Sequence, residues 1–192
     1  MRFCEIYNRI SVPGREEGCP IDLYNCGSYA LDVREWFAPY IDGNEEEDFE
    51  DEPDYYLYTD YERDDRVKDM LDEGYGAEDI LPVAIEWDWK FILAACPWLE
   101  EIQLSEAKDD DRVIAYRLSI DDEIGWSNEE VVEDMDFHFR VRINGVWYEK
   151  CGGSKIFTLG KMTQEEFEEP WENDEVNSPV YTGPIRYARF KR

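Results

Sequence analysis

The stretch FHFRVRINGVWYEK, residues 137–150, gives the strongest local indication of the fold. Its first half alternates apolar and polar residues, as a β-strand with one buried face does. Asn144 and Gly145 form the dipeptide most typical of a two-residue type I′ turn, and apolar residues resume directly after it. Such a turn fixes the register of the two strands, so that Ile143 pairs with Val146. The sequence therefore predicts a β-hairpin here.

A second stretch, NCGSYAL at residues 25–31, predicts the start of a helix. From Cys26 onward, apolar residues recur at helical spacing as far as residue 37. Asn25 is a residue type that caps helix N-termini, and Pro39 follows the last apolar residue of the series. We therefore expect a helix over about residues 26–37. Cys26 would lie in its first turn, where the helix dipole favours the thiolate form of a cysteine.

The chain contains a single histidine, His138, so any Cys–His pair has to use it. Extending the register of the predicted hairpin places Cys151 opposite His138. On residue types alone, two interpretations of Cys26 are open. It is either one half of a Cys–His pair or a small residue of the hydrophobic core, in which case His138 is an ordinary strand residue.

Weaker patterns complete the predicted architecture. Apolar residues at helical spacing follow Pro82 and stop at Pro97, which predicts a central helix between them. Thr163 and Glu166 have the spacing of a capping box, which predicts a short helix that ends before Pro170. The other predicted elements are a short helix over residues 63–73, a short strand at Ile102 and Leu104, a strand over residues 112–120 and a final strand after Gly183.

Length and charge set limits on the class of protein. The chain has 192 residues, 43% hydrophobic and 15% aromatic, which is enough to bury the core of one domain over residues 1–192. Its 48 acidic and 20 basic residues give a net charge of −28. This charge argues against direct binding of nucleic acid or of anionic membranes. It favours a protein partner or substrate with a basic surface.

The negative charge is concentrated in residues 42–79, which carry 18 acidic and 3 basic residues. Aromatic residues are interleaved with these charges and give the segment something to bury. We therefore expect a partly ordered acidic insertion whose carboxylates contact a basic partner. The residues of this predicted partner-binding surface are Glu45, Glu46, Glu47, Asp48, Glu50, Asp51, Glu52 and Asp54.

Five cysteines, an odd number without a C-x-x-C pair, are typical of reduced thiols in a cytoplasm. We expect neither a metal site nor a cofactor, because a zinc site would have to be assembled from scattered cysteines and one histidine. No apolar run approaches the length of a membrane span.

Patterns in the two stretches combine into a longer motif. An Asn-Cys-x-x-Tyr-Ala helix start is followed by an Asp-aromatic-His strand and a Gly-x-Trp return that ends in Lys-x-Gly. This order resembles papain-like thiol hydrolases, in particular the NlpC-like cysteine peptidases and amidases and their small uncharacterised phage and bacterial relatives. The matching residues are Asn25, Cys26, Tyr29, Ala30, Asp136, Phe137, His138, Gly145, Trp147, Lys150 and Gly152.

The resemblance implies an α+β fold in which an N-terminal helix carrying the cysteine packs on an antiparallel sheet. By this similarity Cys26 is the nucleophile and His138 the base of an acyl transfer through a thioester. Glu149 is the candidate for orienting the imidazole, with Asp136 as an alternative. The backbone N–H of Cys26 is the expected oxyanion donor. The residues with a predicted oxyanion or positioning role are Asn25, Trp147 and Lys150.

Other readings stay open beside this one. Cys151 is a rival nucleophile, because the register brings it close to His138. Arg140 and Arg142 share the strand face of His138, which indicates a solvated face. The chain is also compatible with a papain-like fold that has lost its chemistry.

Two functions from different classes follow. The first is a cytoplasmic cysteine hydrolase, in a host cytoplasm if the protein is phage-encoded, that cleaves a peptide or isopeptide bond with Cys26 and His138. The second is a catalytically inactive acidic inhibitor of the anti-restriction or anti-CRISPR type. Its carboxylates would imitate phosphates and occupy a basic groove that normally holds nucleic acid.

Overall fold

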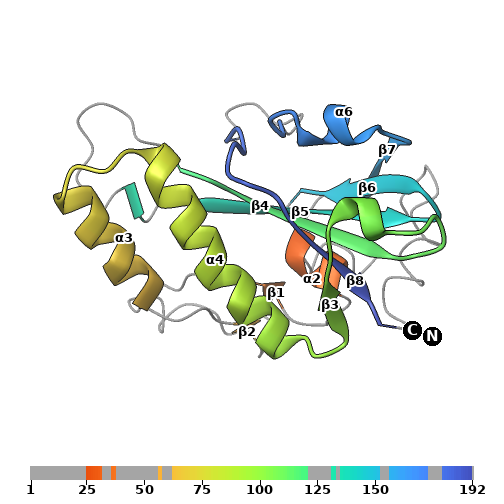
Figure 1. Ribbon diagram of the computed structural model, residues 1–192, viewed down its shortest axis with the longest axis horizontal. Helices are drawn as coiled ribbons and strands as arrows, with labels where there is room; N and C mark the ends of the chain where they lie inside the picture. The colour runs from red at the N-terminus through yellow and green to blue at the C-terminus, as the bar shows by residue number, and fades with distance from the viewer. Residues whose placement is uncertain are drawn as a thin grey trace, which may run out of the picture.

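The centre of the protein is an open six-stranded antiparallel sheet with the order β3-β8-β4-β5-β6-β7 (Figure 1). The structure is a computed structural model, which describes residues 25–31, 36–37, 56–57, 62–120, 131–132, 135–151, 156–172 and 179–191. The strands of the sheet are β3 (Leu99–Glu101), β4 (Val113–Ser119), β5 (Asp136–Ile143), β6 (Val146–Lys150), β7 (Ile156–Gly160) and β8 (Arg186–Phe190).

Helices cover both faces of this sheet. Figure 1 shows α2 and α6 on opposite sides of it, with α4 crossing in front and α3 beside α4. The short strands β1 and β2 form a separate parallel pair. These elements are α2 (Cys26–Leu31), β1 (Trp36–Phe37), β2 (Tyr56–Leu57), α3 (Glu62–Asp72), α4 (Ala77–Ala95), the 3₁₀ helix η2 (Leu104–Glu106) and α6 (Gln164–Glu168).

The predicted hairpin is confirmed as β5 and β6. Ile143 pairs with Val146, as the two-residue turn requires. Asn144 and Gly145 have φ angles of 51° and 76°. Both central residues of a type I′ turn need positive φ, which Asn and Gly adopt at the lowest cost. The regular pairing ends at Arg140 and Glu149, so the predicted pairing of His138 with Cys151 lies beyond its last residue pair.

The sheet divides the interior into two hydrophobic cores. Successive side chains of a strand point to opposite faces, so each central strand contributes to both cores. The first, here called the α4-side core, includes Cys26, Tyr29, Ile85, Trp89, Ile114, Tyr116, Leu118, Phe139 and Val141. The second, here called the α6-side core, consists of Ile102, Val113, Ala115, Trp147, Phe167, Trp171, Tyr181 and Tyr187.

A buried ionic network joins α3 and α4 to the sheet. Arg63 on α3 is 2% exposed and Asp88 on α4 is fully buried. The Arg63 Nη1 donates to both carboxylate oxygens of Asp88 at 3.2 Å, and the Tyr116 hydroxyl on β4 donates to Asp88 Oδ2 at 2.5 Å. Burial raises the pKa of Asp88, against the opposing effect of the Arg63 charge. The end of the acidic segment at residues 42–79 is therefore fixed to the rest of the protein by a charged contact.

Several predicted elements are confirmed, and three are wrong in their limits. The helix over residues 63–73, the strand over residues 112–120, the capped helix after Thr163 and the final strand correspond to α3, β4, α6 and β8. The helix predicted for residues 26–37 is shorter in the structure. α2 covers Cys26–Leu31, and residues 36–37 form the strand β1 instead. These are two aromatic residues, a type enriched in strands.

The central helix begins at Ala77, so Pro82 lies inside it rather than at its start. Buried Ile80 and Leu81 secure the additional turn by packing in the α4-side core. The strand predicted at Ile102 and Leu104 lies a few residues earlier in the chain, as β3. The last residue of β3 that pairs with β8 is Glu101, and Leu104 begins η2.

The fold class is thus α+β, with helices packed on an antiparallel sheet. Among the described residues, no helix combines the length and the apolar character needed to cross a bilayer. Two sets of predicted residues, the acidic surface between residues 45 and 54 and Gly152, lie outside the described part of the chain.

Candidate functional site

The predicted nucleophile Cys26 is held firmly at the start of α2. The Asn25 side-chain oxygen accepts hydrogen bonds from Ser28 N and Ser28 Oγ, both at 3.0 Å. At the other end of the helix, Arg112 donates to the carbonyl oxygens of Tyr29 and Ala30, at 3.0 and 3.1 Å. Asn25 is therefore the helix cap that the sequence predicted. α2 has only six residues, so it contributes little dipole to the thiol.

The surroundings of the Cys26 thiol favour its neutral form. Cys26 is 5% exposed and belongs to the α4-side core. Burial raises the pKa of its thiol from an ordinary 9.0 to about 12, although a backbone hydrogen bond from Phe139 and the charge of Lys150 act in the opposite direction. A thiolate nucleophile needs the reverse shift.

The predicted base His138 lies in the α6-side region, between aromatic rings. Its ring centroid is 5.2 Å from that of Tyr181 and 6.2 Å from that of Trp171. Its Nε2 is 3.5 Å from Glu149 Oε2, a long contact, and no described residue gives it a well-formed hydrogen bond. The predicted orienting residue Glu149 is thus beside His138, but its carboxylate binds Arg140 Nε more closely, at 2.9 Å.

The structure does not bring Cys26 and His138 to the same face of the sheet. Phe139 shares the α4-side core with Cys26, whereas its neighbour His138 contacts Trp171 and Tyr181 of the α6-side core. Neighbouring residues of β5 point to opposite faces of the sheet, so Phe139 and His138 face different cores.

The His138 face was expected to be solvated, and this expectation is wrong. His138 and Arg140 are 2% and 6% exposed. The Arg140 guanidinium carbon lies 4.6 Å from the ring centroid of Trp171 and 5.9 Å from that of Phe167. The cover comes from α6 and from Trp171, which lie more than twenty residues along the chain from His138 and Arg140, so the local alternation gave no sign of it.

The remaining predicted site residues pack against other side chains, form hydrogen bonds or are buried. Trp147 stacks on Phe167 with ring centroids 3.8 Å apart. Lys150 is 1% exposed, and the alternation of β6 points it away from Glu149. Asp136 accepts a hydrogen bond from the Tyr181 hydroxyl at 2.5 Å. Cys151 is buried, one residue beyond β6. Within the described ranges, no group of three metal-ligating side chains comes together.

A groove of about 640 Å³ lies elsewhere, where α4, β3, η2, α6 and the segment leading into β8 meet. Its walls combine apolar residues with two exposed carboxylates, Glu101 on β3 and Glu168 on α6. Glu101 Oε1 accepts a hydrogen bond from Trp89 Nε1 at 2.9 Å, and Glu168 Oε1 accepts one from Gln164 Nε2 at 2.6 Å. Each of these carboxylates also interacts with an arginine, Glu101 with Arg186 and Glu168 with Arg117.

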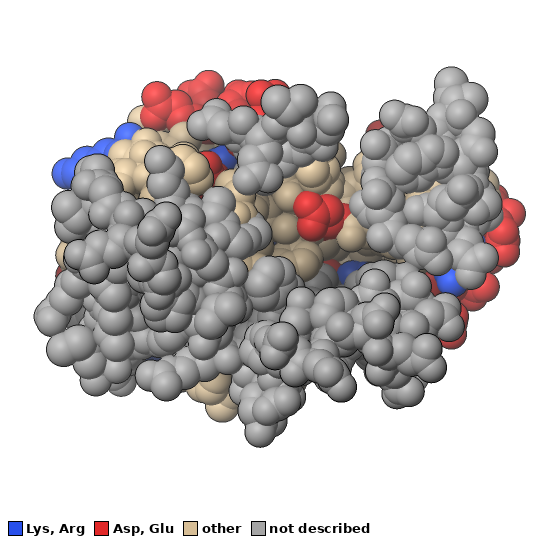
Figure 2. Space-filling model, turned by 180° about the vertical axis from the view of Figure 1, so that it is seen from behind, with Lys and Arg blue, Asp and Glu red and all other residues tan. Residues whose placement is uncertain are grey.

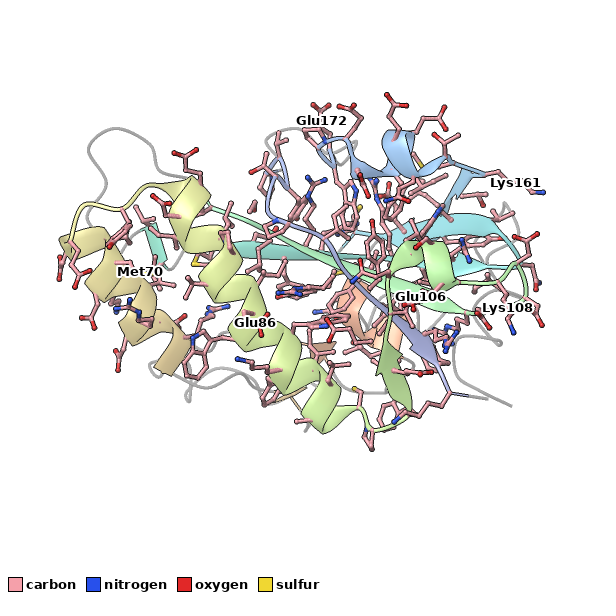
Figure 3. All side chains as sticks on the ribbon, viewed as in Figure 1. Met70, Glu86, Glu106, Lys108, Lys161 and Glu172 are labelled. Carbon is pink, nitrogen blue, oxygen red and sulfur yellow. The ribbon has the colours of Figure 1, made fainter. Side chains whose placement is uncertain are left out.

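Two arginines also line the groove, and both are already bound to the protein. Arg117 donates to the carbonyl oxygens of Gly183, Glu169 and Thr182, at 2.6, 2.7 and 3.3 Å. Arg186 forms an ion pair with Glu86 on α4, a residue labelled in Figure 3, and its Nη1 lies 3.7 Å from Glu101 Oε1. These guanidinium groups therefore fix the walls of the groove.

Tyr187 lines the same groove and carries an unsatisfied polar group. It is 8% exposed, and among the residues that the structure describes its hydroxyl has no hydrogen-bond partner. Burial and the nearby charge of Glu168 raise its pKa, so the hydroxyl stays protonated. The sequence contained the capping box that places α6. It held no sign that Tyr187 and η2 would meet that helix.

Exposed carboxylates gather on two parts of the surface. Figure 2 shows them along the rim over α6 and at the edge over α3. The α6 acidic surface consists of Glu165, Glu166, Glu168, Glu169 and Glu172, and the α3–α4 acidic corner of Asp65, Asp69, Asp72, Glu73, Glu78 and Asp79. Within the described part of the chain, no residue of the α6 acidic surface forms an ion pair with Lys or Arg.

Comparison with known proteins adds no relative. No family model matches the chain, and neither a curated protein nor a solved structure matches it.

Proposed function

We propose that this protein binds a basic surface of another protein, of the kind that normally holds nucleic acid, and that it acts there as an acidic inhibitor. The observation that carries the proposal is the α6 acidic surface, whose carboxylates form no ion pair with Lys or Arg among the described residues. Such carboxylates remain available to Lys and Arg side chains of a partner, and the net charge of −28 would accelerate the encounter.

The interior of the protein supports this assignment. Arg63, Arg117, Arg140 and Lys150 are buried, so part of the small supply of basic residues is not available to neutralise the surface. The cations near the surface are largely engaged as well, since Arg186 and Arg189 pair with carboxylates of α4 and β3. The α6 acidic surface thus carries an excess of negative charge.

The hydrolase hypothesis receives less support. Cys26 belongs to the α4-side core, His138 contacts a ring of the α6-side core, and burial favours the neutral thiol. Acyl transfer by a Cys–His pair needs the two groups within hydrogen-bond reach.

The test measures binding of the full chain to a fluorescent decapeptide of arginine and lysine, and competition with duplex DNA for a basic DNA-binding protein. Affinity should fall steeply, by about tenfold or more, between roughly 0.05 and 0.3 M salt, because screening weakens charge pairs. An affinity that does not depend on salt, or failure to displace DNA, would refute the proposal.

A matched pair of variants tests the location. Glu165→Gln with Glu169→Gln removes two charges from the α6 acidic surface, and Asp109→Asn with Asp110→Asn removes two from an exposed turn. The first pair should lower the affinity for the decapeptide about three- to tenfold at low salt, and the second by less than about twofold. Equal losses would mean that net charge acts without a defined surface.

A further inference from the structure

We infer that Arg117, a buried residue of β4, is the positioning residue of the α6 acidic surface. This inference rests on the proposed function, and it names the interior contact that keeps the carboxylates of α6 in one arrangement toward the partner. Arg117 is 7% exposed, so it acts on a partner through α6 rather than by direct contact.

The α6 helix has few contacts of its own to hold it in place. It has five residues, Gln164–Glu168, of which only Phe167 is buried. A helix this short is not stable without support from the rest of the protein. Glu165 repels Glu168 and Glu169, which follow it at helical spacing, and the last turn contains no basic residue. The carbonyl groups at the C-terminal end of α6 therefore need donors from outside the helix.

Two buried side chains supply these donors. Trp171 Nε1 donates to the Phe167 carbonyl oxygen at 2.8 Å, and Arg117 Nη1 donates to the Glu169 carbonyl oxygen at 2.7 Å. The Arg117 guanidinium carbon also lies 5.5 Å from the ring centroid of Trp171. Thr163 caps the other end of the helix. The C-terminal end of α6 is thus tied to β4 through one guanidinium group.

The strand that carries Arg117 is a firm support for this contact. β4 pairs with β5 on one side and with β8 on the other, so it lies inside the sheet. Arg117 also donates from Nε to the Gly183 carbonyl oxygen at 2.6 Å and from Nη2 to that of Thr182 at 3.3 Å. All three nitrogens of the guanidinium are therefore used. A lysine has a single donor nitrogen and cannot reach these separated acceptors together, so Arg117→Lys keeps the charge and loses the positioning.

Net charge and positioning predict opposite effects of removing Arg117. If a partner responds to net charge alone, loss of this cation makes the protein more negative and strengthens the binding of a basic peptide. If Arg117 positions α6, its loss weakens the binding, because the carboxylates no longer hold the arrangement that contacts the partner. The sign of the change therefore distinguishes the two.

The experiment measures the affinity of the full chain for the decapeptide of arginine and lysine, at about 0.05 M salt. The variants are Arg117→Met, Arg117→Lys and the control Arg66→Met. We expect both Arg117 variants to bind about three- to tenfold more weakly. The control removes the same charge as Arg117→Met from an exposed position on α3, and it should bind equally well or up to about twofold more tightly.

Hydrogen–deuterium exchange separates local positioning from general stability. In both Arg117 variants, exchange should become faster in residues 164–171 and stay unchanged in the β5–β6 hairpin. Faster exchange in the hairpin as well, or loss of the native circular dichroism spectrum in Arg117→Lys, would overturn the inference, because Arg117 would then support the whole sheet.

The binding results also distinguish this inference from the proposed function. If the wild-type protein binds the decapeptide with steep salt dependence and the Arg117 variants bind as Arg66→Met does, Arg117 does not position the surface and the acidic-surface function stands. If the wild-type protein does not bind the decapeptide at low salt, the proposed function fails and this inference fails with it.

Discussion

Arg63→Met is the substitution with the clearest consequence for stability. It removes the cation that contacts both oxygens of Asp88 at 3.2 Å, in a network where the two side chains are 2% and 0% exposed. Breaking a buried ion pair from one side costs about 3–5 kcal/mol, because the remaining charge has no water to solvate it. The Tyr116 hydroxyl still donates to Asp88, which keeps one hydrogen bond in place.

The loss should depend on pH in a defined direction. Burial already raises the pKa of Asp88, and removal of Arg63 raises it further. Between the unfolded pKa, near 3.8, and the higher folded pKa, the folded state binds more protons than the unfolded state. Stability of the variant therefore falls as pH rises through this window, and it recovers on acidification as Asp88 takes up a proton.

Urea unfolding followed by tryptophan fluorescence measures both effects, at about pH 7.5 and pH 5. Arg66→Met, on the exposed side of the same helix, is the control and should change stability by less than about 0.5 kcal/mol. Adding Asp88→Asn to Arg63→Met should restore most of the loss, with a coupling of about 2 kcal/mol or more. A loss below about 1 kcal/mol at neutral pH would refute the reasoning, as would one that is equal at both pH values.

Three further predictions concern single residues. Cys26 should resist iodoacetamide in the folded protein at pH 7, as read by mass spectrometry, because burial raises its thiol pKa to about 12; rapid labelling would contradict this. Gly183→Ala should destabilise by about 1–3 kcal/mol in urea, because a Cβ there would lie 2.9 Å from the Leu118 carbonyl oxygen, and an unchanged midpoint would rule this out. Thr163→Ala should cost about 0.5–2 kcal/mol, because its Oγ1 accepts the Glu166 N–H at 3.2 Å; Thr163→Ser should keep most of the stability.

Local signals predicted the elements that depend on local chemistry. The hairpin required only alternation and the Asn144–Gly145 turn, and α6 required only its capping box. The limits of α2 and α4 could not be predicted in the same way. Apolar residues at helical spacing continued past residue 31 to residues 36–37, which form β1. Pro82 resembled the first residue of a helix, but α4 begins one turn earlier, at Ala77, because residues of that turn are buried.

The candidate Cys–His pair illustrates a different limit. The alternation of residues 137–143 already placed His138 on the face opposite Phe139. A helix that starts with Cys26 would pack on the apolar face, as α2 does, which separates the two residues. The groove depended on contacts between residues 101–105, 164–168 and 182–187, and no local pattern connects such distant segments.

The position of β8 inside the sheet sets an order for assembly on the ribosome. β3 pairs only with β8 among the described strands, and β8 also covers one edge of β4. During translation, β4 and the hairpin emerge more than thirty residues before β8, and until then that edge of β4 has no partner. An uncovered strand edge can pair with another nascent chain. Once residues 186–190 have been synthesised, β8 can pair with β4, and the edge of β4 is no longer open to pairing with another chain.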